Sequence, residues 1–407
     1  MSLADLQARE AAALLPTYAR QPVTFVAGEG AELIDADGVR YLDFLCGLSV
    51  TSLGHAHPAV AEAVAAQMRT LVHVSNLFYT EGQIRLAERL GQTLGWPDAK
   101  AFFCNSGAEA NEAAIKLARR HGKMQDPDKV RVVALEGGFH GRTLAALRTT
   151  GNADKHAPFM PLGAWVTHVP FDDPAALTAA VDDDVCAVWL EVVQGEGGVR
   201  PVSPAVLAAA RAACDAHDAL LVVDEVQTGI GRLGAWYGWQ TTAVEPDVVC
   251  LAKALAGGLP MGAIVAHGRA AAAFGPGDHA TTFGGGPVLA AAALAVLDTI
   301  ASQGLLTRAA ELGARLTATL TELVARHDLA VGVRGVGLLQ ALELDRPVAA
   351  AVTAAALEHR LVVNAVAPDA IRLAPPLIID EQDLATMAER LSAALGDVAA
   401  QEGSEGS

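Results

Sequence analysis

Strand-like and helix-like segments alternate through the middle of this chain. Between about residue 58 and residue 300, short apolar runs are separated by stretches rich in alanine, which is a strong helix former. The runs that we expect to be buried strands are 131–135, 185–193, 219–223, 247–251 and 263–266. Such alternation predicts an α/β fold in which helices flank a mostly parallel central sheet with right-handed crossovers.

The two ends of the chain follow another pattern. After an expected helix within the first 20 residues, positions 22–45 alternate apolar and polar side chains around Asp37-Gly38, a hairpin signal. Near the C-terminus, two amphipathic helices are expected to flank strand-like stretches at 331–344 and 361–374. We therefore expect a large domain and a smaller, discontinuous α+β domain. The predicted divisions are an N-terminal arm and part of the small domain at 1–57, the large domain at 58–300, the rest of the small domain at 301–400, and a frayed polar tail at 401–407.

The composition limits the classes of function. Of 407 residues, 52% are hydrophobic and 18% are charged, which indicates a globular protein. A net charge of −17 disfavours a nucleic acid or an anionic membrane as partner. Five scattered cysteines without a C-x-x-C pair predict neither a disulfide framework nor a metal site. With no evident signal peptide and no apolar run of about 18 residues, we expect a cytoplasmic protein.

Lys253 carries the strongest chemical signal. The apolar run 247–251 delivers it into a turn of small residues that ends in Gly257-Gly258. A lysine at the mouth of a buried strand is costly unless its charge is lost or used. A Schiff-base lysine needs this setting, because the amine must lose its proton before it attacks an aldehyde. The alternative from this segment alone is a lysine that snorkels at a strand end.

Asp224 closes the apolar segment 219–223, so its carboxylate is expected at the strand ends where open α/β sheets bind ligands. A carboxylate there can pair with the protonated ring nitrogen of pyridoxal phosphate, and that pairing makes the ring an electron sink. The alternatives are a helix cap or a Mg²⁺ ligand of a nucleotide enzyme. The second would require a phosphate loop, and the chain has no G-x-x-x-x-G-K-[ST].

Ser106-Gly107-Ala108-Glu109 predicts the start of a helix. Ser106 and Glu109 have the spacing of a capping box, and an alanine-rich stretch follows. Because Gly107 and Ala108 add almost no side chain, the first amide N–H groups of the helix are left open to an anion such as a phosphate ester.

Together with further motifs, these segments resemble the class III aminotransferases, which are pyridoxal-phosphate-dependent enzymes of fold type I. The resemblance runs nearly end to end and rests on Gly54-His55-Ala56-His57-Pro58, Phe139-His140-Gly141-Arg142-Thr143, Gln194-Gly195-Glu196-Gly197-Gly198, Asp224-Glu225-Val226-Gln227-Thr228-Gly229, Lys253, Thr281-Thr282-Phe283-Gly284-Gly285 and Arg334-Gly335-Val336-Gly337. Within the family it points to members that move the δ-amino group of N2-acetyl-L-ornithine to 2-oxoglutarate in arginine biosynthesis.

The resemblance implies roles for individual residues. Lys253 would form the Schiff base and carry the proton, Asp224 would hold the ring nitrogen, and Glu196 would complete the catalytic set. The implied cofactor site consists of Lys253, Ser106, Gly107, Ala108, Phe139, His140, Asp224, Val226, Gln227 and Thr282. Thr282 would reach the cofactor of a neighbouring subunit, so a homodimer with shared active sites is implied.

The implied substrate residues are Arg142, Thr281, Arg372 and Glu196. Arg372 would bind the α-carboxylate of glutamate, and Glu196 would pair with Arg372 when the other substrate brings no carboxylate to that position. Several alternatives remain open. The amino donor could be ornithine, succinylornithine, 4-aminobutyrate or an aminoadipate-derived amine; the enzyme could be an aminomutase of the glutamate-1-semialdehyde type; or the chain could be a non-enzymatic scaffold.

Overall fold

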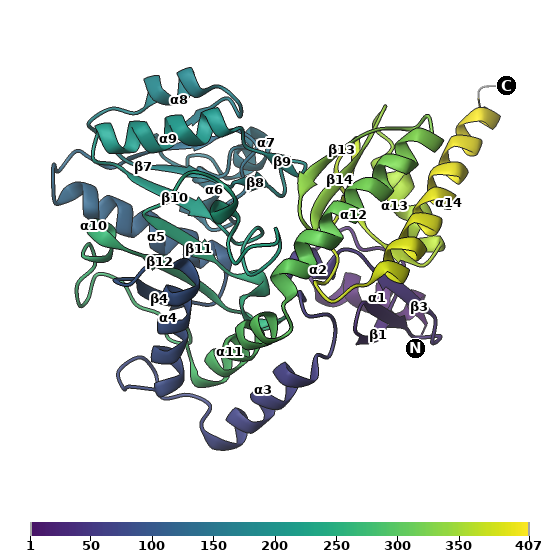
Figure 1. The fold of residues 1–407 in the computed structure, drawn as a ribbon, viewed down its shortest axis with the longest axis horizontal. Coiled ribbons are helices and arrows are strands. Elements are labelled where there is room, and N and C mark those ends of the chain that lie inside the picture. The colour runs from purple at the N-terminus through teal and green to yellow at the C-terminus, as the bar shows by residue number, and fades with distance from the viewer. Residues whose placement is uncertain (1, 406–407) are drawn as a thin grey trace.

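A seven-stranded sheet forms the centre of the large lobe in the computed structural model, which describes residues 2–405 (Figure 1). Its strands, in spatial order, are β4 (Lys100–Cys104), β12 (Gly262–Ala266), β11 (Val248–Leu251), β10 (Leu220–Asp224), β7 (Val185–Leu190), β5 (Arg131–Leu135) and β6 (Val166–Val169). Strand β10 pairs in parallel with β7 and β11, and β5 pairs in parallel with β7 and β6. The predicted mostly parallel sheet is therefore confirmed.

The direction of β12 was not predicted, and the bounds of one predicted strand were wrong. Strand β12 runs antiparallel to both β11 and β4. The connection from Leu251 to Gly262 is too short for the crossover that a parallel neighbour requires. The segment 185–193 is also not one strand, because β7 ends at Leu190 and β8 (Val193–Gln194) pairs separately with β9 (Arg200–Pro201).

The strands of the sheet place alternate side chains on opposite faces. In β10, Leu220 and Val222 pack toward α5 (Gly107–Lys123), whereas Leu221 and Val223 pack toward α9 (Pro204–Ala216). Helix α8 (Pro174–Ala180) lies beside α9 on the second face (Figure 1). Because side chains alternate along a strand, Asp224 continues the row of Leu220 and Val222 and faces the side of α5.

The smaller lobe combines both ends of the chain. An antiparallel sheet of β13 (Ala330–Val336), β14 (Leu339–Leu344), β17 (Ala370–Leu373) and β16 (Asn364–Ala367) lies beside helices α12 (Leu305–Arg326), α13 (Ala349–Glu358) and α14 (Glu381–Glu405). A second sheet contains β1 (Phe25–Glu29), β2 (Glu32–Asp35), β3 (Arg40–Asp43) and β15 (Leu361–Val362). The predicted hairpin turn joins β2 to β3, and β3 pairs in parallel with β15. This pairing supports a discontinuous small domain, whose exact boundaries stay a prediction.

The remaining helices are α1 (Leu3–Ala13), α2 (Cys46–Ser49), α3 (Pro58–Thr70), α4 (Glu81–Leu94), α6 (Leu144–Thr149), α7 (Ala153–His156), α10 (Gly268–Ala271) and α11 (Pro287–Ser302). Helix α14 continues to Glu405, so residues 401–405 are helical where we expected a frayed tail, because the preceding Ala399, Ala400 and Gln401 favour helix. Residues 406–407 of that tail lie outside the described part. Within residues 2–405, no single helix is long and apolar enough to cross a membrane, and the one helix pair that reaches this length together, α11 with α12, is bent by 69°.

Candidate active site

One cavity of about 450 Å³ lies where β10 and β11 end and α5 begins. Its walls contain most of the residues that the sequence singled out, namely Ser106, Gly107, Ala108, Phe139, His140, Arg142, Glu196, Asp224, Val226, Gln227 and Lys253. Three predicted residues, Arg372, Thr281 and Thr282, are not in its walls. Arg372 nevertheless contacts two residues of the wall. The two threonines line a different cavity, although the Thr281 hydroxyl accepts from Nδ2 of Asn105, a wall residue of the first cavity, at 3.4 Å.

Lys253 begins a short 3₁₀ turn, Lys253–Ala256, directly after β11. Its φ of 47° is in the left-handed region, which is unfavourable for a residue with a Cβ and is tolerated mainly where the surrounding structure holds it. Burial lowers the pKa of its amine to about 8; Glu196 opposes this effect and Arg372 adds to it. A neutral amine that faces a cavity can act as a nucleophile, which a snorkelling lysine in bulk water cannot do as readily.

The lowered pKa of Lys253 predicts a pH dependence for attachment of an aldehyde cofactor. Because the free amine is the reactive form, the attachment rate of the cofactor-free protein should rise about tenfold per pH unit below pH 8 and level off above it. The measurement is the growth of visible absorbance after mixing with pyridoxal phosphate, corrected with the signal of Lys253→Ala. A corrected rate that stays constant between about pH 6.5 and 9.5 would contradict the lowered pKa.

Asp224 is 3% exposed and fully engaged by neighbouring donors. Its Oδ2 accepts from Nδ2 of Asn111 at 2.9 Å and lies 2.9 Å from Nδ1 of His140, while its Oδ1 accepts from the amide of Val226 at 3.0 Å. Asn111 is itself fixed, because its Oδ1 accepts from the indole N–H of Trp189 at 2.9 Å. The carboxylate is thus held in one orientation at the cavity wall.

Asn111 belongs to this network but was not predicted. It lies four residues after Gly107, on the buried side of α5, and its amide also donates to the Gly107 carbonyl at 2.9 Å. A buried polar residue on an otherwise apolar helix face was the available signal, since such groups need specific partners. His140, which the resemblance assigns to the cofactor site, lines the cavity, and its ring contacts Asp224.

The helix start predicted at Ser106 is present, although its cap differs in detail, and its use as an anion site stays a prediction. Ser106 accepts from the amide of Glu109 at 3.1 Å. The Glu109 carboxylate accepts from the amide of Asn105 at 2.6 Å, instead of the Ser106 amide that a complete capping box would use. The amides of Gly107 and Ala108 have no acceptor within the helix and lie at the cavity wall. A Cβ on Gly107 would lie 3.0 Å from Cγ1 of Val226, so the close approach of Val226 favours glycine.

Glu191 is a second residue that sequence reasoning missed. It is 5% exposed, and its two oxygens accept from the amides of Phe139 at 3.0 Å and Gly195 at 3.1 Å. Burial raises the pKa of this carboxyl group to about 7, against the opposing effect of His140. The available signal was an acidic residue directly after a continuous apolar strand. Glu191 connects the aromatic wall at Phe139 with the turn that carries Glu196.

Arg372 and Glu196 form an ion pair behind the cavity. Nη1 of Arg372 donates to Oε1 of Glu196 at 2.5 Å and to Oε1 of Gln227 at 3.2 Å, and its Nε donates to Oδ1 of Asn364 at 3.1 Å. The Arg372 side chain is 1% exposed and that of Glu196 is 30% exposed. Burial would raise the pKa of Glu196, but the charge and hydrogen bond of Arg372 lower it overall. Glu196 and Arg372 are 176 residues apart in the sequence, yet the fold brings their charged groups into contact.

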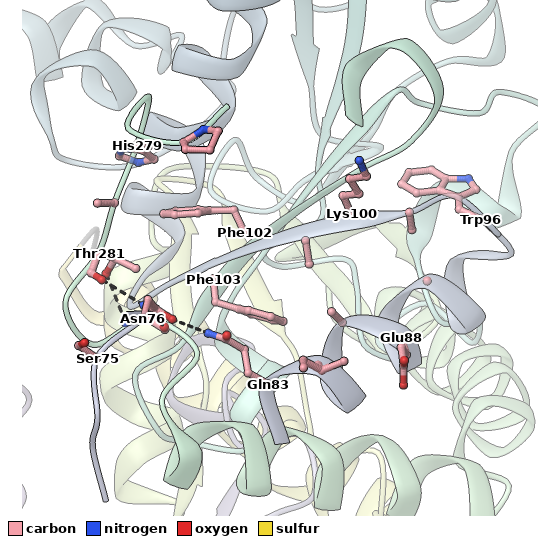
Figure 2. Close-up of a pocket in the computed structure, with 18 of the residues that line it drawn as sticks. Ser75, Asn76, Gln83, Glu88, Trp96, Lys100, Phe102, Phe103, His279 and Thr281 are labelled. Carbon is pink, nitrogen blue, oxygen red and sulfur yellow. Dashed lines mark hydrogen bonds between the residues drawn. The ribbon is translucent and has the colours of Figure 1, made fainter. Parts of the chain in front are cut away.

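Thr281 and Thr282 line a second cavity, of about 1750 Å³. Figure 2 shows Asn76 beside this loop, where its amide donates to the carbonyls of Thr281 and Gly284, both at 3.1 Å, and Gln83 donates to Asn76 at 2.7 Å. The threonine loop is therefore held in place at a surface cavity and does not enter the cavity of Lys253.

The donor groups at the first cavity fit pyridoxal phosphate. A deprotonatable amine, a fixed carboxylate and the amides of a helix start match, respectively, the aldehyde, the ring nitrogen and the phosphate of that cofactor. In the described residues no cluster of three His, Cys, Asp or Glu side chains has a metal-binding arrangement.

Comparison with known proteins agrees with this chemistry. Residues 16–395 match the model of the family described as aminotransferase class III. The chain is 50% identical over 397 residues to an acetylornithine aminotransferase of Mycolicibacterium smegmatis, covering 98% of this chain and 99% of that protein. It is 51% identical over 378 residues to an acetylornithine aminotransferase of Streptomyces coelicolor, covering 93% and 92%.

A solved structure extends the comparison to the fold. The crystal structure of ornithine aminotransferase from Toxoplasma gondii superposes with a TM-score of 0.93 at 30% sequence identity, covering 98% of this chain and 96% of that chain. The fold is therefore shared by proteins whose names give different amino donors.

Proposed function

The chain belongs to the class III aminotransferase family, and on that premise we propose that it transfers the δ-amino group of N2-acetyl-L-ornithine to 2-oxoglutarate in arginine biosynthesis. The products are N-acetylglutamate semialdehyde and glutamate. The observation that carries the proposal is the Arg372–Glu196 pair at the wall that also holds Lys253. The names of relatives at 43–51% identity support the same donor.

Pyridoxal phosphate, the cofactor of this family, supplies an aldehyde that exchanges with amines and a pyridinium ring that withdraws electrons from the carbon that loses its proton. Lys253 would hold the aldehyde carbon and move the proton at its Nζ. Asp224, fixed by Asn111 and His140, would keep the ring nitrogen protonated. Phe139 would cover one face of the ring, and the amides of Gly107 and Ala108 would bind the phosphate.

Arg372 and Glu196 would select the substrates. Glutamate brings an α-carboxylate, which can form a bidentate pair with the Arg372 guanidinium once Glu196 has moved away. N-acetylornithine presents a terminal amine whose neighbouring carbon has no carboxylate. In that half-reaction Glu196 stays on Arg372, so the buried guanidinium is never left without a negative partner. Arg142, which lines the cavity mouth, is available for the distant carboxylate of this donor.

Glu196→Ala should shift the enzyme toward α-amino substrates. The glutamate half-reaction should keep its rate or gain, since no competing carboxylate remains, while the N-acetylornithine half-reaction should slow by about tenfold because Arg372 is then unpaired. Stopped-flow absorbance measures each half-reaction separately. Glu10→Ala, at an exposed salt bridge on α1, is the matched control. A ratio of half-reaction rates equal to that of this control would refute the proposed movement of Glu196 on and off Arg372.

We also propose that two copies of the chain share their active sites. Large apolar side chains are exposed on the segment before α4, including Leu77 at 86%, Phe78 at 68% and Tyr79 at 97%. Phe283, next to Thr282, is 64% exposed on the same side as the second cavity. An exposed apolar patch of this kind marks a protein interface. A second copy related by a two-fold axis would cover it and bring Thr282 toward the partner's cofactor phosphate.

The double substitution Phe78→Asp/Tyr79→Asp should break this dimer. Placing two carboxylates in an apolar interface leaves them buried without partners, so the protein should sediment as a monomer and bind pyridoxal phosphate at least tenfold more weakly. Met124→Asp changes an exposed apolar residue elsewhere, at 58% exposure, and should remain dimeric. A double variant that sediments like Met124→Asp would exclude this interface.

A panel of amino donors with 2-oxoglutarate, compared as kcat/KM, tests the proposed substrate. N-acetylornithine should exceed ornithine, succinylornithine, 4-aminobutyrate and the aminoadipate-derived amine by at least about tenfold, or about 1.4 kcal/mol in barrier. A smaller preference would indicate an ω-aminotransferase that accepts a broader range of amino donors. An aminomutase of the glutamate-1-semialdehyde type would release no 2-oxoglutarate when glutamate is added, and a scaffold would show no change in visible absorbance.

We place the reaction in the cytoplasm. All five cysteines are free and buried, and burial raises the pKa of their thiols. A chain without disulfides is consistent with a reducing compartment.

A further inference from the structure

Lys155 is a half-buried cation beside the active site that the proposed reaction does not yet use. It belongs to α7, and its Nζ lies 5.1 Å from the centroid of the Phe139 ring, which the Arg142 guanidinium approaches to 5.5 Å. Among the side chains that the structure describes, no carboxylate oxygen lies within 4 Å of this amine. Burial lowers the pKa of Lys155, Arg142 lowers it further, and Glu196 raises it. A cation in this setting gains from a carboxylate that comes closer.

Of the two residues in the Arg372–Glu196 pair, Glu196 is the one that is held by fewer contacts. Arg372 is 1% exposed and is held by Asn364, Gln227 and the carbonyl of Gly195 in addition to Glu196. The Glu196 side chain is 30% exposed, and its single hydrogen-bond partner in the described residues is Arg372. A substrate carboxylate that binds Arg372 must therefore displace Glu196, and a partly buried carboxylate without a partner is costly.

The contacts of Lys155 and the turn that carries Glu196 both lead to one buried carboxylate, that of Glu191. The two oxygens of the Glu191 carboxylate accept from the amides of Phe139 and Gly195. The Phe139 ring lies 5.1 Å from the Lys155 amine, and Gly195 directly precedes Glu196. Besides Arg372, the cations that act on the Glu196 charge are Lys253 and Lys155. In the glutamate half-reaction Arg372 is occupied by substrate and Lys253 reacts at the cofactor, so Lys155 is the remaining cation of these three, and Arg142, at the same Phe139 ring, is the other cation nearby.

We propose that Lys155 receives the Glu196 carboxylate when a substrate carboxylate displaces it from Arg372. Lys155 is then a positioning residue of the glutamate half-reaction and has no part in the half-reaction of the δ-amino donor. This inference rests on the proposed function, because it requires that glutamate and 2-oxoglutarate bind at Arg372.

Lys155→Met tests the proposal, since methionine keeps an apolar side chain of similar length and removes the charge. Glutarate, an unreactive dicarboxylate shaped like 2-oxoglutarate, serves as the equilibrium probe, with its Kd on the cofactor-loaded enzyme measured by calorimetry. We expect the Kd of glutarate to rise about tenfold and the glutamate half-reaction to slow by a similar factor. The N-acetylornithine half-reaction should change less than about twofold. Lys155→Arg should restore both glutamate-side values, and Lys123→Met, at an exposed lysine at the end of α5, should match the wild type.

The double variant Lys155→Met/Glu196→Ala decides between a specific pair and a general disturbance. Without Glu196 there is no carboxylate to receive, so Lys155→Met should then have no further effect on the Kd of glutarate. Additive losses would overturn the proposal, as would a loss confined to N-acetylornithine, which would assign Lys155 to the carboxylate of that donor. If the methionine variant is not recovered folded, Lys155→Gln carries the same test. A wild-type enzyme that binds no glutarate would instead refute the proposed function.

Discussion

Lys253→Ala should lower kcat by at least about 10⁴-fold while the protein stays folded. The variant loses both the amine that holds the cofactor and the group that moves the proton, and each contribution is large when the amine is buried with a pKa of about 8. The left-handed φ of 47° at this position is no more strained for alanine than for lysine, because both residues carry a Cβ, so thermal stability should fall little. Steady-state turnover and a circular dichroism melt measure the two quantities.

Small amines provide the control for Lys253→Ala. Methylamine can enter the space of the missing side chain and accept the proton, so it should restore part of the activity in proportion to its concentration. Lys253→Arg keeps a cation that cannot lose its proton near neutral pH and should be as inactive as the alanine variant. Activity within about tenfold of wild type in either variant would show that another residue carries the chemistry.

Asp224→Asn should reduce kcat/KM by about 10³-fold, which corresponds to about 4 kcal/mol in barrier. The asparagine keeps the shape of the side chain but removes the negative charge that stabilises a protonated ring nitrogen, so the ring withdraws electrons less strongly. The amide must also face Asn111 and His140 in place of a carboxylate, which leaves donors opposed to donors. The measurements are kcat/KM with both substrates and the Kd of pyridoxal phosphate.

Asn111→Ala separates the charge of Asp224 from its orientation. It removes one hydrogen bond to the Oδ2 atom and the partner of the Trp189 indole, but it leaves the carboxylate in place. We therefore expect a smaller loss, about tenfold to a hundredfold in kcat/KM. If Asp224→Asn were no more harmful than Asn111→Ala, the carboxylate charge would not be the main contribution of this network.

The parts of the fold and site that the sequence predicts are those with a local signal. The length and composition of the apolar runs identified β5, β10 and β11. Asp224 and Lys253 lie at or just after the ends of β10 and β11, and they were expected in one site because the ends of parallel strands meet at one edge of a sheet. The helix start at Ser106 was readable from its cap and its small residues. Arg372 and Glu196 came from family resemblance, because nothing near either residue in the sequence predicts the other.

The features that escaped prediction depend on contacts between distant segments. Asn111 is an ordinary polar residue of a helix until Trp189 and Asp224 approach it from two strands. Glu191 becomes important only because the turns at Phe139 and Gly195 both direct amides toward it. The direction of β12 is likewise set by the length of its connection, since the apolar pattern of a strand is the same in either direction.

The convergence of one amine, one carboxylate and one helix start on a single cofactor can be tested by borohydride reduction of the loaded enzyme. Reduction makes the link between cofactor and protein permanent, and peptide mass spectrometry then locates it. The expected result is one modified peptide, carrying pyridoxal phosphate on Lys253, with loss of the label in Lys253→Ala. A label on a different lysine, or no label in an enzyme that still turns over, would contradict the account.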